Sequence, residues 1–172
     1  MSELYETDFF LWVEEQARLL RRRAKTANND ELDYRNLAEE IESVGASQKR
    51  EVRSRLALIL QHLLKWLYQP DLRSRSWEAT LLVQRRDLVA LFEDSPSLRP
   101  FAEGVLPAAF ANGRQAAERE TGLLGIPETC PWVLDQVLDL DFLPFERPLV
   151  ASPRAATSTV RRRRSDLDRG MS

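Results

Sequence analysis

Apolar residues recur at helical spacing along most of the chain. The first such segment has apolar residues at steps of three, four and seven, namely Phe9, Trp12, Val13, Leu20 and Ala24. Thr7 or Asp8 precedes this pattern and offers a side-chain cap for the first turn. The segment is therefore predicted to form an amphipathic helix.

A second apolar stripe follows a turn-like segment of polar residues. Tyr34, Leu37, Ile41 and Val44 share one helical face, and Gly45 interrupts the pattern. Because glycine is common at helix ends, this stripe predicts a second helix that ends or kinks at Gly45.

The widest apolar face lies in the next segment, which Ser47 can cap and Pro70 terminates. This segment is predicted to be the central core helix. A fourth helix is predicted to start at Ser74 or Ser76 and to end before the motif DSPS.

The remaining helical segments contain prolines. Residues 97–121 are expected to form two helices or one kinked helix because Pro107 lies inside the pattern. Thr129 and Pro131 suit the start of a short final helix. No segment alternates as a strand would, so we expect an all-α, single-domain bundle of five to seven helices.

The charge is distributed unevenly along the chain. Residues 1–144 carry 18 Lys and Arg against 24 Asp and Glu, whereas residues 145–172 carry 7 against 3. The second segment also lacks apolar periodicity, which is typical of chains that bury too little surface to fold. We therefore expect a helical domain over 1–144 and a disordered, Arg-rich tail over 145–172.

Composition excludes several classes of protein. No apolar run approaches the roughly 20 residues that span a bilayer, and the first residues lack a basic start and a cleavage site for secretion. We therefore expect a cytoplasmic protein with no membrane contact. Cys130 is the single cysteine, which excludes an intramolecular disulfide and a zinc site built from cysteine pairs.

Six collinear sequence blocks carry a resemblance to a known family. They are YETDFFLWVEEQARLLR, NLAEEIESVG, HLLKWLYQPDLRSRSW, DSPSLRP, PETCPW and DFLP, and they cover about residues 5 to 144. In these blocks the chain resembles the bacterial family called domain of unknown function 29. The resemblance implies an all-helical fold and supplies no catalytic residue, because the family has no established activity. The Arg-rich tail lies outside the family pattern.

The block HLLKWLYQPDLRSRSW contains the best candidate for a binding site. Its arginines flank a predicted helix start, where free backbone amides also favour anions. Its tryptophans offer stacking faces, and neighbouring carboxylates lie in the block NLAEEIESVG. The candidate polar or anion site comprises Glu39, Glu40, His62, Lys65, Arg73, Arg75 and Trp77.

The competing interpretation of these residues is structural and is favoured. The arginines then pair with Glu39, Glu40 or Glu42, and His62 holds two helices in register. No metal is expected, because one histidine cannot supply the two Glu-x-x-His motifs of a helical di-iron site, and Glu40 with His62 makes an incomplete ligand set. Cys130 at a predicted helix start is a weaker candidate for a reactive thiol than for a buried anchor.

These observations favour a non-enzymatic protein-interaction or adaptor role without a cofactor. No nucleophile elbow, phosphate-binding glycine loop or dinucleotide fingerprint occurs. One alternative is weak nucleic-acid association through Arg161, Arg162, Arg163 and Arg164, with Arg85 and Arg86 as further contacts. Another alternative is a small anionic ligand or an enzyme site around His62, Arg73 and Arg75.

Overall fold

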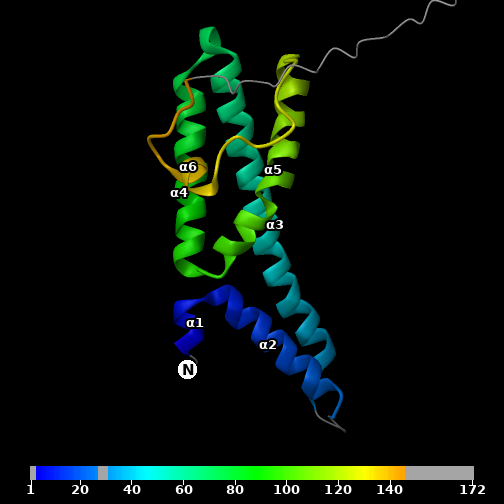
Figure 1. The fold of residues 1–172 in the computed structure, drawn as a ribbon. Coiled ribbons are helices and arrows are strands. Elements are labelled where there is room, and N and C mark those ends of the chain that lie inside the picture. Colours follow the sequence, from blue (N-terminus) through cyan, green and yellow to red (C-terminus); the bar gives the residue numbers. More distant parts are fainter. Residues whose placement is uncertain (1–2, 27–30, 146–172) are drawn as a thin grey trace, which may run out of the picture.

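The computed structural model describes residues 3–26 and 31–145, and every regular element in these ranges is helical. Figure 1 shows an elongated molecule in which one long helix, α3 (Tyr34–Tyr68), runs from an arm at one end into a bundle at the other. The described residues form six α-helices, which confirms the predicted all-α bundle.

The bundle forms around the C-terminal half of α3. It contains the short turn η1 (Pro70–Leu72), α4 (Arg75–Asp94), α5 (Leu98–Thr121) and α6 (Leu134–Leu138). The apolar face predicted for the central helix is its core, because α3 places a row of fully buried side chains against α4 and α5. That row consists of Val52, Leu56, Ile59, Leu60, Leu63 and Leu64.

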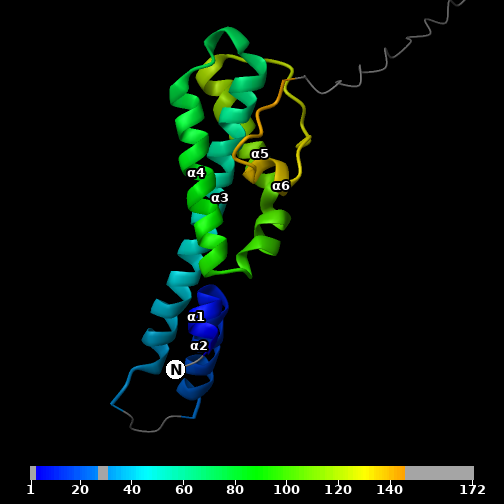
Figure 2. The same cartoon turned by 90° about the vertical axis from the view of Figure 1, so that its left-hand side faces the viewer.

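The arm consists of α1 (Glu3–Thr7), α2 (Phe9–Ala24) and the N-terminal half of α3, and Figure 2 shows α2 lying beside α3. The predicted cap at Asp8 is confirmed, because its carboxylate accepts the Leu11 amide at 2.9 Å. The same carboxylate accepts the amide and the hydroxyl of Ser97, each at 2.8 Å. Asp8 therefore fixes the base of the arm to the turn between α4 and α5.

The predicted break at Gly45 is wrong, and so is the helix start at Ser47. α3 is one helix of 35 residues, and Gly45 lies inside it as a buried position that faces Phe10 and Val13 of α2. A glycine ends a helix when it takes a positive φ angle, which among the described glycines only Gly122 and Gly125 do. Gly45 is instead a packing residue.

The C-terminal helices match their predictions only in part. α5 is one uninterrupted helix with Pro107 inside it, so two separate segments do not form. Pro107 is exposed, and α5 ends at Gly122 in the left-handed conformation. α6 begins at Leu134 rather than near Pro131, and its first turn is held by the Gln136 side chain, which accepts the Val133 amide at 3.2 Å.

The predicted tail lies outside the described residues except for Phe145, so its disorder and its arginines stay predictions. The division of the chain at residue 144 stays a prediction for the same reason. Within residues 3–26 and 31–145, no helix is long and apolar enough to cross a membrane.

Candidate functional site

Lys65 has its charge satisfied inside the bundle. The side chain is buried, with the residue only 4% exposed, and its Nζ lies 2.5 Å from Oε1 of Glu120 on α5. The ammonium also lies 4.6 Å from the centre of the Trp77 ring. Glu120 accepts a second hydrogen bond from Gln61 at 2.7 Å, and the hydrogen bond from Lys65 lowers the pKa of this carboxyl. Lys65 thus joins α3, α4 and α5.

His62 is half-buried on the same helix, and its Nδ1 donates to the carbonyl oxygen of Leu58 at 2.9 Å. Burial lowers the pKa of this imidazole, and the nearby Lys65 charge lowers it further. His62 is therefore held in its neutral form. No group of three or more metal-binding side chains occurs in the described parts of the chain.

The two arginines of the candidate site have different environments. Arg73 donates from Nε to the carbonyl oxygen of Trp66 at 2.9 Å, and its guanidinium lies 5.1 Å from the centre of that indole ring. Arg75 is exposed and lines a surface hollow of about 450 Å³ beside Leu82 and Leu140. Arg73 is therefore structural, whereas Arg75 is accessible.

The expected pairing of these arginines with the carboxylates of α3 is wrong. Glu39 and Glu42 pair with Arg21 of α2 instead. Glu40 lies 22 residues before His62 on the same continuous helix, which separates them by about 33 Å at 1.5 Å per residue. Glu39 and Glu40 therefore belong to the arm, and the seven candidate residues do not meet in one site.

Arg85 was a candidate phosphate contact, and the structure assigns it another role. Its side chain is buried and its guanidinium donates to the carbonyl oxygens of Val137, Leu140 and Phe142. Burial lowers the pKa of this arginine. Arg85 therefore fastens the segment after α6 to α4, whereas Arg86 is exposed.

Cys130 is half-buried and precedes α6 by four residues, so it is not at a helix start. Burial raises the pKa of its thiol, and its Sγ donates to the carbonyl oxygen of Trp132 at 3.3 Å. This environment keeps the thiol protonated and favours the interpretation of Cys130 as an anchor.

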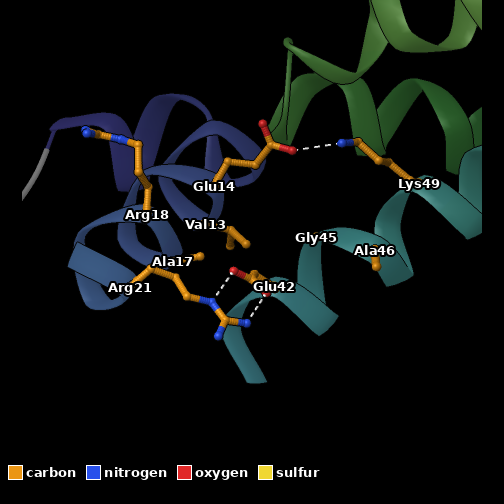
Figure 3. Close-up of a pocket in the computed structure, with 9 residues that line it drawn as sticks. All are labelled: Val13, Glu14, Ala17, Arg18, Arg21, Glu42, Gly45, Ala46 and Lys49. Atoms are coloured by element: carbon orange, nitrogen blue, oxygen red, sulfur yellow. Dashed lines mark hydrogen bonds and ion pairs between the residues drawn. The ribbon is translucent and has the colours of Figure 1, made fainter. Parts of the chain in front are cut away.

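One edge of the arm holds a groove of about 530 Å³ between α2 and α3. Figure 3 shows an apolar floor between two ion pairs, one at each end. Lys49 contacts Glu14 at 2.8 Å, and Arg21 contacts Glu42 through two hydrogen bonds of 2.8 and 2.9 Å. The floor consists of Val13, Ala17, Gly45 and Ala46.

The ion pairs of this groove connect the two helices of the arm. The hydrogen bonds from Arg21 lower the pKa of Glu42, and the same contact raises the pKa of Arg21. The two side chains are 40% and 47% exposed, so water and salt screen their attraction. The pairs orient α2 on α3 and leave few charges free to bind a ligand. We call this side the charged edge.

The other edge of the arm is apolar. Leu37 and Val44 of α3 are 40% and 39% exposed, although the sequence predicted both within a core stripe. The small residues Ala38 and Gly45 are buried in their place. At about 100° per residue, Leu37 points half a turn away from Ala46 of the charged edge.

Aromatic residues of α1 and α2 extend this apolar surface. Tyr5 is 44% exposed and its ring lies 4.8 Å from that of Trp12 and 5.7 Å from that of Phe9, both in edge-on contacts. Arg23 lies over the ring of Tyr34 at the other end of the arm. We define the apolar edge as Phe9, Trp12, Tyr34, Leu37, Ile41 and Val44, with Tyr5 beside it.

Sequence reasoning missed this edge because it assigned the whole stripe to the core. A signal was present, since Ala38, Gly45 and Val52 also repeat at steps of seven. A second helix can approach more closely on a small-residue row than on a stripe of larger side chains.

Comparisons with known proteins agree with the helical fold. A family model with the description "Domain of unknown function DUF29" matches residues 4–143. A crystal structure of an α-helical protein of unknown function from Rhodospirillum rubrum superposes with a TM-score of 0.70 at 24% identity. The superposition covers 83% of this chain and 93% of that protein. No curated protein matches the chain.

Proposed function

We propose that this chain, which belongs to the family described as "Domain of unknown function DUF29", is a helical protein-interaction module. Its binding surface is the apolar edge of the arm, and a cytoplasmic location is part of this proposal. The description of the family names no activity, so the proposal rests on the surface of the molecule itself.

The observation that carries the proposal is the orientation of α3 in the arm. An amphipathic helix normally turns its larger apolar side chains inward. Here the small Ala38 and Gly45 are buried, while the larger Leu37 and Val44 remain 40% and 39% exposed. Apolar surface costs about 25 cal/mol per Å² when it is exposed, and contiguous exposed patches commonly mark interaction sites.

Photo-crosslinking in cells of the source organism tests this proposal. A photoreactive amino acid at Val44 should give crosslinked products that mass spectrometry identifies. The matched control is Leu11, which is 43% exposed and lies on the outer face of α2, away from α3. Equal crosslinking at the two positions, or none at Val44, would remove the support for this surface.

A small anionic ligand at the opposite end of the molecule is a second proposal with narrower support. His62, Lys65 and Arg73 are engaged by internal partners. Arg75 is an exposed residue that lines a hollow together with Glu78 and Asp141. Inorganic phosphate should then shift the amide resonance of Arg75 in an NMR titration, and an Arg75→Ala variant should lose the other shifts around this hollow.

A further inference from the structure

We infer that the partner on the apolar edge is a second copy of this chain, with the two arms antiparallel about a twofold axis. The inference rests on the proposed function, because it names the occupant of the same surface. In this arrangement the α2 and α3 helices of both chains form a four-helix bundle.

The spacing along α3 suits helix pairing. Tyr34, Leu37, Ile41, Val44 and Gln48 follow one another at steps of three and four, as the seam positions of a coiled coil do. The seam spans 14 residues, or about 21 Å. Among the described residues, α2 is the helix that packs along this half of α3, and Leu37 and Val44 of the seam remain partly exposed.

The charges along the arm favour an antiparallel pair of identical chains. Residues 3–15, at the base of the arm, contain five acidic residues and no Lys or Arg. Around its tip, residues 18–26 and 31–42 contain six Lys and Arg against five acidic residues. A twofold axis across the middle of the arm places the nearly neutral tip of each arm beside the acidic base of its partner. A parallel pair would instead bring the two acidic bases together.

One unsatisfied polar atom indicates the register. Oε1 of Gln48 is buried and has no hydrogen-bond partner among the described residues. A twofold axis at Ile41 brings each Gln48 opposite Tyr34 of the second copy, since both lie seven residues from Ile41. Because this oxygen is covered within one chain, the Gln48 side chain has to rotate when the chains pair before the Tyr34 hydroxyl can donate to it. A polar residue within an apolar seam commonly fixes the register of paired helices.

The mass of the full chain in solution tests the inference. Light scattering and sedimentation should give twice the 19.9 kDa of one chain. A double variant with Leu37→Asp and Val44→Asp should be monomeric with unchanged helix content, because both side chains are already partly exposed in one chain. The control Leu11→Asp should remain dimeric. Raising the NaCl concentration from 50 to 500 mM should weaken dimerisation.

A short bis-maleimide linker tests the register in a Cys130→Ser background. Ile41→Cys should crosslink two chains efficiently, whereas Leu11→Cys should not. A monomeric wild-type chain, or a dimer that survives the Leu37 and Val44 substitutions, would overturn the inference. If Val44 crosslinks to a different protein while the chain is monomeric, the proposed function stands and the second copy is excluded. If Val44 crosslinks to nothing, both proposals fail.

Discussion

Replacing Gly113 by alanine tests the closest approach between α5 and α3. A Cβ atom at this position would lie 2.6 Å from the carbonyl oxygen of Ala57 and 3.0 Å from the amide nitrogen of Gln61. Both are backbone atoms within α3, so neither can rotate away as a flexible side chain could. The two helices must separate to admit the methyl group, and their shared core loosens as they do.

Two opposing effects set the size of the change. Alanine is the better helix former by about 0.8–1 kcal/mol. Overpacking a tight contact costs about 1–3 kcal/mol, and a clash between two backbones belongs at the upper end of that range. We therefore expect Gly113→Ala to lower the free energy of unfolding by about 2 kcal/mol, which is the difference between the two effects.

Gly104 is the matched control, because it lies in the same helix and a Cβ there would meet nothing within 4 Å. Gly104→Ala should raise the free energy of unfolding by about 0.5–1 kcal/mol. The two variants should thus differ by about 3 kcal/mol, or about 6–12 °C in melting temperature. Urea denaturation followed by circular dichroism measures both values. Equal stability of the two variants would refute the assignment of Gly113 as a contact glycine.

Three further predictions concern polar groups inside the fold. Arg85→Met should lower the free energy of unfolding by about 2–4 kcal/mol, because one buried and two partly buried carbonyl oxygens lose their donor. Hydrogen exchange should speed up first in residues 139–145, and unchanged exchange there would contradict the assigned role. Asp8→Ala should cost about 2–3 kcal/mol in urea denaturation, since it removes a helix cap and two bonds to Ser97, whereas loss of the cap alone would cost only about 1 kcal/mol. The folded chain holds the pKa of His62 below the unfolded value of 6.5, so the unfolded state binds the proton more readily and stability should fall as the pH drops through 6.5. In the His62→Gln variant the urea midpoint should change less between pH 7.5 and 5.5 than in the wild-type chain. A wild-type midpoint that rises as the pH is lowered from 7.5 to 5.5 would contradict the reasoning.

Sequence patterns predicted the core of the bundle because that part of α3 has a strong contrast between its faces. Residues 56–67 place an apolar side chain at nearly every inward position. The cap at Asp8 could be predicted equally well, since a cap depends on residues only three positions apart. The bonds from Asp8 to Ser97 could not be predicted, because they join positions 89 residues apart.

The candidate site was less predictable because it depended on the path of the chain. A break at Gly45 would have let the segment with Glu39 and Glu40 fold back toward His62. The continuous helix carries these carboxylates into the arm, where Arg21 of α2 meets Glu39. Arg85 could have been recognised as a buried residue, because it follows Leu81 by four positions and precedes Leu88 by three in the inward stripe of α4.

Because α3 belongs to both the arm and the bundle, its length sets both the reach of the arm and the direction in which the edges of the arm face. One residue inserted between the two halves would extend the reach of the arm by about 1.5 Å and swing its edges by about 100°. Seven inserted residues would extend the reach by about 10 Å with a swing of only about 20°. The length of the arm is therefore free to change only in steps that preserve the direction in which its apolar edge faces.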